Sequence, residues 1–212
     1  MVRVDLWIAL ITLALGTFVA VTHESVGEGH AAAADRAILH WMSDRRTPTI
    51  NGLMVGVTTF GSRTFLTALI VVTLATLLVR RERREAIHLI VASLGTGALV
   101  WVTKGIVERA RPTEVAHVVD VSGFSYPSGH SAATATLYLT MALIASSHLR
   151  TRAARAALVA GVAVLVALVG LSRIYLGVHY PSDVLGGMSL GASWALLLAA
   201  AVAVLTARRA TN

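Results

Sequence analysis

Hydrophobic residues along the chain recur in six long runs, which are separated by polar connections. The runs have 15 to 24 residues each. A helix that crosses a bilayer needs about 20 mostly apolar residues, with a range of roughly 17–25. We therefore expect an all-α fold, a bundle of six transmembrane helices that forms a single domain, 1–212. The predicted spans are Leu6–Thr22, Phe65–Val79, Ala86–Val107, Ser131–His148, Ala156–Ser172 and Val184–Ala207.

Two of these runs need further argument. The second is short, but it can extend upstream through residues 61–64, with Arg63 reaching toward the headgroups. The first follows Arg3 and has a signal peptide as its alternative interpretation. It lacks a small-residue cleavage pattern and is long for the apolar region of a signal peptide, which favours a membrane span.

The connection between the first two spans, His23–Arg63, contains a short amphipathic pattern. In "ADRAILHWMSDRRTP", a helix would bring Ile38, Leu39, Trp41 and Met42 near one another. We expect this helix to lie on the outer membrane surface. Packing against that surface is favoured over binding of a partner protein.

The composition supports a membrane protein. Hydrophobic residues make up 56% of the 212 residues, the mean hydropathy is +0.72, and charged residues make up only 14%. A soluble domain usually has about 25% charged residues. There is no cysteine, which excludes thiolate and disulfide chemistry. The formal net charge of +7 lies in clusters between the apolar runs, so it indicates membrane topology and no nucleic-acid partner.

The distribution of charge predicts the orientation of the spans. Cytoplasmic loops of membrane proteins are enriched in Lys and Arg. With both termini in the cytoplasm, the cytoplasmic segments have a net charge of +7, the whole formal charge of the chain. We therefore predict a multi-pass protein of the cell membrane with connections 23–63, 108–128 and 174–182 outside. The cytoplasmic basic residues are then Arg3, Arg80, Arg81, Arg83, Arg84, Arg150, Arg152, Arg155, Arg208 and Arg209.

Three polar clusters fall at the predicted outer ends of spans. Each alone has an ordinary explanation: Lys104 and Arg173 can reach the headgroups, and Ser128 can cap a helix. The topology nevertheless brings all three clusters to one face of the membrane. They are "KGIVERARP" with Lys104 and Arg111, "PSGH" with Ser128, Gly129 and His130, and "SRIYLGVHYPSD" with Arg173, His179 and Asp183.

The cations in these clusters predict a phosphate site. If the third span continues as a helix to Arg111, this residue and Lys104 share a face two turns apart, and Pro112 then ends the helix. Arg173 adds a third cation. The start of the fourth span offers free backbone N–H groups, and the missing side chain of Gly129 allows an anion to approach.

The two histidines and the aspartate indicate the chemistry. Phosphoryl transfer needs a nucleophile and often an acid for the leaving oxygen, and two imidazoles can divide these roles. Asp183, four residues after His179, can hold one ring nitrogen and direct the other toward phosphorus. His130 has no such neighbour, which suits proton transfer. A metal site is the alternative, but three nearby cations disfavour it.

With these clusters the chain resembles the type 2 phosphatidic acid phosphatase family, the lipid phosphate phosphatases. The family pattern is K-x6-R-P, P-S-G-H and S-R-x5-H-x3-D. All three parts match within residues 104–183 in residue type, spacing and order. The family also includes soluble vanadium haloperoxidases, but six apolar runs disfavour that branch.

The resemblance implies a role for each matched position. His179 would form a phosphohistidine, Asp183 would orient it, and His130 would protonate the leaving group and then activate water. No metal or other cofactor is implied. Arg109 is outside the pattern, and a contact with lipid headgroups is favoured for it over a second phosphate. The phosphate would be held by Lys104, Arg111, Arg173, Ser128 and Gly129.

We therefore predict an integral membrane phosphatase that hydrolyses a lipid phosphate or diphosphate at the outer leaflet. A phosphotransferase with the same site is the alternative, and a transporter is disfavoured because the middles of the spans lack charges. The substrate's tail would lie between helices. For the small residues at 95–97 and 186–193, close helix packing is favoured over a tail groove. The oligomeric state and the choice among phosphatidylglycerol phosphate, phosphatidic acid and polyprenyl substrates stay open.

Overall fold

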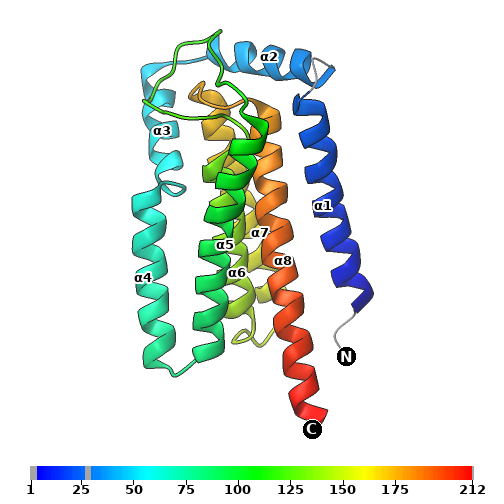
Figure 1. The fold of residues 1–212 in the computed structure, drawn as a ribbon. Coiled ribbons are helices and arrows are strands. Elements are labelled where there is room, and N and C mark those ends of the chain that lie inside the picture. Colours follow the sequence, from blue (N-terminus) through cyan, green and yellow to red (C-terminus); the bar gives the residue numbers. More distant parts are fainter. Residues whose placement is uncertain (1–3, 27–29, 212) are drawn as a thin grey trace.

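The protein is an all-α bundle in the computed structural model, which describes residues 4–26 and 30–211 (Figure 1). Five of the six apolar runs lie within helices, and the sixth, Ser131–His148, extends two residues beyond α6, so the prediction of an all-α fold is confirmed. The helices are α1 (Val4–Val26), α2 (His30–Ser43), α3 (Pro48–Thr59), α4 (Arg63–Val79), α5 (Arg83–Val107), α6 (Gly129–Ser146), α7 (Arg152–Tyr175) and α8 (Pro181–Thr211).

Helix α6 is the central element, and it contacts α5, α7 and α8. Its closest approach is to α8, where two glycines face its backbone. A Cβ atom at Gly187 would lie 2.5 Å from the carbonyl oxygen of Ser128, and one at Gly191 would lie 2.3 Å from that of Ala132. Only glycine fits at such distances. The packing interpretation of residues 186–193 is therefore confirmed.

The glycines of the 95–97 segment in α5 differ from each other. A Cβ atom at Gly95 would lie 2.4 Å from the ring of Trp194 on α8, so this position serves helix packing. Gly97 has nothing within 4 Å of the corresponding point. The packing interpretation therefore holds for Gly95 and not for Gly97.

The predicted number of membrane spans is only partly matched. Within residues 4–26 and 30–211, five segments are long and apolar enough to cross a membrane, and the predicted fourth span, which forms α6, is not among them. This helix buries Ser131, Thr134, Thr136 and Thr140 in contact with protein, so it can be less apolar than a helix that faces lipid. The five segments are Asp5–Ser25, Pro48–Val79, Arg83–Val107, Arg152–Tyr175 and Pro181–Thr206.

The second span is longer than predicted and consists of two helices. Residues 48–59, which we expected in a loop, form α3, and a break at residues 60–62 separates it from α4. Thr47 caps α3, with Pro48 in its first turn, and Ser62 caps α4. Proline at the first position of a helix is favourable because its missing N–H would have no partner there. The connection predicted between the first two spans therefore ends at Thr47.

The amphipathic helix predicted in this connection is α2, which lies across one end of the bundle (Figure 1). Leu39 is fully buried and packs against Val115, Ile174 and Val184. Ile38 and Trp41 are exposed. The helix therefore attaches to the bundle through one narrow face.

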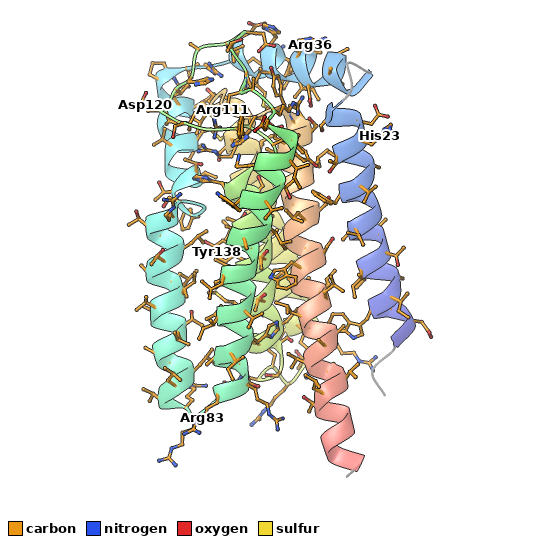
Figure 2. The ribbon with its side chains drawn as sticks, viewed as in Figure 1. His23, Arg36, Arg83, Arg111, Asp120 and Tyr138 are labelled. Carbon is orange, nitrogen blue, oxygen red and sulfur yellow. The ribbon has the colours of Figure 1, made fainter. Side chains whose placement is uncertain are left out.

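The start of α1 and the end of α8 lie at the end of the bundle opposite α2 (Figure 1). Arg83 lies at that same end, whereas Arg111 lies near α2 (Figure 2). Arg3 lies outside the described residues, as do the side chains of Arg208 and Arg209. Sites near α2 and sites near Arg83 therefore belong to opposite ends of the bundle.

The contact between α6 and α8 yields a stability prediction. Gly191→Ala places a methyl group against the carbonyl oxygen of Ala132, and such overpacking costs about 1–3 kcal/mol of unfolding free energy. We expect a lower melting temperature in detergent for this variant. Gly161→Ala in α7 is the matched control, because nothing lies within 4 Å of its Cβ position. Equal melting temperatures for the two variants would contradict the packing argument.

Candidate active site

The predicted phosphate-binding cations meet through a loop. Helix α5 ends at Val107, because Glu108 adopts the left-handed conformation with φ of 48°. The predicted end of the third span at Val107 is therefore confirmed, and the helix does not continue to Arg111. Residues 108–128 instead form an irregular connection at the α2 end of the bundle.

Lys104 and Arg111 bind the same stretch of this connection. The Nζ atom of Lys104 donates to the carbonyl oxygens of Phe124 and, at 3.3 Å, Ser125. The guanidinium of Arg111 donates to the carbonyl oxygen of Gly123 at 2.9 Å. Carbonyl oxygens orient a cation without cancelling its charge. Both side chains therefore keep their charge available for an anion.

Arg173, near the end of α7, is the most deeply placed of the three cations. The residue is 4% exposed, and its Nη1 atom donates to Thr58 Oγ1 on α3 at 2.9 Å. Its Nε atom is buried and has no hydrogen-bond partner among the described residues. An unpaired buried cationic group is costly. This arrangement is suited to an anion that supplies the missing acceptor.

His179 lies in the short connection between α7 and α8, 2% exposed, and its hydrogen-bond partners define its tautomer. Its Nε2 atom lies 3.2 Å from Nη1 of Arg111, which can only donate, so Nε2 carries the lone pair. Its Nδ1 atom lies 3.4 Å from Oδ2 of Asp183, which accepts the ring proton. The lone pair of Nε2 therefore faces the cations and accepts a hydrogen bond from Arg111.

Burial, together with the guanidinium groups of Arg111 and Arg173, lowers the pKa of His179 to about 4, against an opposing contribution from Asp183. The imidazole is therefore neutral at pH 7. A neutral imidazole with its lone pair toward a cationic pocket has the protonation state of a nucleophile.

Asp183 is fully buried in the first turn of α8, and donors hold both of its oxygens. Oδ1 accepts from Arg109 Nη1 at 2.7 Å. Oδ2 accepts from the hydroxyl of Ser125 and, at 2.8 Å, from the backbone N–H of Tyr180. This set of contacts fixes the plane of the carboxylate beside His179.

The "PSGH" cluster begins α6 as expected. The Ser128 hydroxyl accepts from the backbone N–H of Ser131 at 3.4 Å, and the backbone N–H of Ser128 donates to the carbonyl oxygen of Asp183 at 2.9 Å. The capping interpretation of Ser128 is thus correct. Gly129 is the first residue of the helix. A phosphate contact for either residue stays a prediction.

His130 lines a cavity of about 530 Å³ between α4, α5 and α6. Lys104 and Gly129 also line this cavity, whose remaining wall is largely apolar and includes Val100, Trp101 and Leu137. Gly61, in the break between α3 and α4, lies against the ring: a Cβ atom there would be 3.1 Å from Cδ2 of His130. His130 therefore joins a polar site to an apolar space.

Arg109 does not have the predicted role. It pairs with Asp183 and, at 2.8 Å through Nη2, with Asp35 of α2, so the favoured contact with lipid headgroups is wrong. Asp35, Ser125 and Thr58 also contact the site residues and were not predicted from the sequence. Asp35 alone carried a signal: four residues before Leu39, it lies on the apolar face of the amphipathic helix.

Together the predicted residues form one site at the α2 end of the bundle. A neutral imidazole, an orienting carboxylate, three cations and a second imidazole beside an apolar cavity can bind and transfer a phosphoryl group. Among the described residues no cluster of three or more His, Cys, Asp or Glu side chains could hold a metal ion.

The chain belongs to the PAP2 superfamily, whose family model matches residues 85–207. It is 39% identical to phosphatidylglycerophosphatase B of Bacillus subtilis over 75% of this chain and 78% of the relative. It is 31% identical to an undecaprenyl-diphosphatase of Sulfolobus acidocaldarius over 69% of this chain and 67% of the relative. The chain is a membrane lipid phosphatase.

A comparison with solved structures supports the assignment to the PAP2 superfamily. The fold matches the crystal structure of a transmembrane PAP2-type phosphatidylglycerolphosphate phosphatase from Bacillus subtilis, with a TM-score of 0.84 and 32% identity over 90% of this chain and 94% of that one. Aquifex aeolicus LpxE, at 24% identity and a TM-score of 0.62 over 77% of this chain and 93% of that one, shares the fold. The chain is thus a multi-pass membrane protein.

The environment of His179 predicts an acidic titration. The imidazole is unprotonated above its pKa, so the nucleophilic form should persist down to about pH 4, well below the ordinary value of about 6.5. We expect a ¹⁵N-histidine NMR titration of the protein in detergent to give this midpoint for the resonance that disappears in His179→Ala. Asp183→Asn should lower the midpoint further, because it removes the charge that stabilises the imidazolium. A midpoint near 6.5 would contradict the burial argument.

Proposed function

We propose that the protein hydrolyses a lipid phosphate or diphosphate at the outer leaflet through a phosphohistidine on His179. The observation that carries this proposal is the placement of His179, whose unprotonated Nε2 faces Arg111 while its Nδ1–H is directed at Asp183. In the first step Nε2 bonds to phosphorus, and the bond between phosphorus and the lipid oxygen breaks. A protonated His130 gives its proton to that oxygen.

In the second step, water attacks the phosphohistidine and the bond between phosphorus and nitrogen breaks. His130, now neutral, takes the proton from that water, so the enzyme returns to its starting state with inorganic phosphate bound. Lys104, Arg111 and Arg173 stabilise the equatorial oxygens in both steps, with the Ser128 hydroxyl and the Gly129 N–H as further donors. These cations supply the charge that a divalent ion would otherwise bring.

The substrate's tail is placed in the cavity between α4, α5 and α6. This cavity begins beside His130 and Lys104, and its wall is largely apolar, which suits a leaving group that carries acyl or prenyl chains. Gly97 lines it without a close neighbour, so this glycine leaves room for a chain. The names of the relatives support both glycerophospholipid and polyprenyl substrates, and phosphate release from a panel of such lipids would identify the preferred one.

We place the site at the extracytoplasmic side, with both termini in the cytoplasm and α6 as a sixth span. The charge distribution of the sequence supports this orientation, since the end of the bundle with Arg83 carries the basic connections. The site near α2 then faces outward, where a lipid headgroup in the outer leaflet can reach it.

Rapid-quench labelling tests the roles of the two histidines. With a ³²P-labelled aryl phosphate in the presence of EDTA, His179→Ala should trap no label, because the nucleophile is absent. His130→Ala should accumulate label, since an aryloxide leaves with little protonation while the water step lacks its base. His148→Ala, exposed at the opposite end of the bundle, is the matched control and should behave as wild type.

Label trapped in His179→Ala but never in His130→Ala would reverse the assignment of the two histidines. Loss of all labelling with EDTA and its return with Mg²⁺ would refute the metal-free mechanism. Asp183→Asn should slow labelling strongly without abolishing it. The comparable loss in a serine triad is about 10⁴-fold.

Single-cysteine labelling tests the orientation, because the chain has no cysteine of its own. Thr113→Cys, in the connection next to the site, should react with an impermeant thiol reagent in intact cells. Thr151→Cys, at the opposite end, should react only after the membrane is permeabilised. The reverse pattern would place the site in the cytoplasm.

A further inference from the structure

Two residues outside the three-part pattern connect α2 to the catalytic aspartate. Arg109 lies between two carboxylates, with Nη2 at 2.8 Å from Asp35 Oδ2 and Nη1 at 2.7 Å from Asp183 Oδ1. Asp35 is 3% exposed and Asp183 is fully buried. This line of charges reaches His179 through the other oxygen of Asp183.

Asp35 also holds the beginning of α8. Its Oδ1 accepts the backbone N–H of Ser182 at 2.9 Å, and its Oδ2 accepts the Ser182 hydroxyl. Ser182 is in the first turn of α8, directly before Asp183, and its hydroxyl also accepts from Arg109 at 2.7 Å. The surface helix therefore fixes both the backbone and the side chain beside the catalytic aspartate.

We propose that Asp35 and Arg109 are positioning residues, which hold the Asp183 carboxylate so that its Oδ2 faces the Nδ1–H of His179. Arg109 occupies Oδ1, while Ser125 and the N–H of Tyr180 occupy Oδ2, so the carboxylate has no freedom to rotate. His179 is thereby kept in the tautomer whose Nε2 lone pair faces the phosphate site.

The charge count favours this role over binding of substrate by Arg109. Its guanidinium is already paired with two carboxylates and stacks over the ring of Tyr180, 4.3 Å from the ring centre. The carboxylates raise the pKa of Arg109 even though burial lowers it. By contrast, Lys104 and Arg111 bind only carbonyl oxygens and His179 among the described residues. The positioning role rests on the proposed use of His179 as nucleophile.

The direct test is the tautomer of His179, read from ¹⁵N shifts and one-bond couplings in detergent. Wild type should show a proton on Nδ1 and none on Nε2. Arg109→Gln and Asp35→Asn should mix the two tautomers, and Arg109→Lys should restore most of the wild-type signal because it keeps the charge. Arg36→Gln and Asp44→Asn are matched controls at exposed positions of α2 and the turn after it, and they should leave the signal unchanged.

Kinetics supply the second readout. Loss of a group that orients a functional histidine typically costs about 10–100-fold, and we expect that loss in kcat for Arg109→Gln and Asp35→Asn, with little change in KM. The double variant should lose less than the product of the two single losses, because the pair acts as one unit. The loss should be the same for a monophosphate and a diphosphate lipid.

Different failures are distinguishable. A higher KM for the diphosphate lipid alone in Arg109→Gln, with kcat and the tautomer unchanged, would make Arg109 a substrate-binding residue and overturn the positioning role. If Arg109→Gln and Asp35→Asn lower the melting temperature but leave the tautomer of His179 unchanged, the contacts of Asp35 and Arg109 stabilise the fold only, and the proposal is refuted. If wild type releases no phosphate from any lipid, the proposed function fails, while the tautomer measurement still decides the role of Arg109.

Discussion

The close contact between α6 and α8 is the constraint on which the active site depends. Gly187 and Gly191 allow the backbones of these helices to approach until side chains are excluded between them. At the end of this contact, the backbone N–H of Ser128 donates to the carbonyl oxygen of Asp183 at 2.9 Å. The helix that carries His130 and the helix that carries Asp183 are therefore joined directly at the site. Catalysis depends on placement to within about half an ångström, and a backbone contact is a rigid way to provide it.

Charge in the site is divided into two groups with separate tasks. Asp35 and Asp183 pair with Arg109, and this pairing serves geometry. Lys104, Arg111 and Arg173 form no ion pair within the described ranges and bind carbonyl oxygens, a hydroxyl oxygen and the neutral ring of His179 instead. Those oxygens position the three cations while leaving their charge uncompensated. The loop 108–128 thus supplies Arg109 to the paired network and Arg111 to the cationic pocket.

The sequence was sufficient for the helical bundle and for the convergence of the three clusters, because apolar run length and loop order determine both. It was insufficient where a contact joins distant residues. Asp35 and Arg109 are 74 positions apart, so no local spacing reveals their pairing. The apolar run gave the end of α5 at Val107, but not the left-handed conformation of Glu108, which keeps Lys104 and Arg111 from sharing one helix. Helix α3 was taken for a loop because Asn51, Gly52 and Gly56 weaken its apolar pattern.

The unpartnered Nε atom of Arg173 links the stability of the protein to its own product. A ligand that binds the folded state alone stabilises it by about 2.7 kcal/mol at a concentration 100 times its Kd. Inorganic phosphate bound among Lys104, Arg111 and Arg173 would relieve the repulsion between these cations and supply the acceptor that Arg173 lacks. Phosphate should therefore protect the enzyme against heat and inhibit it at the same time. Purification in phosphate buffer would then yield a more durable but slower preparation.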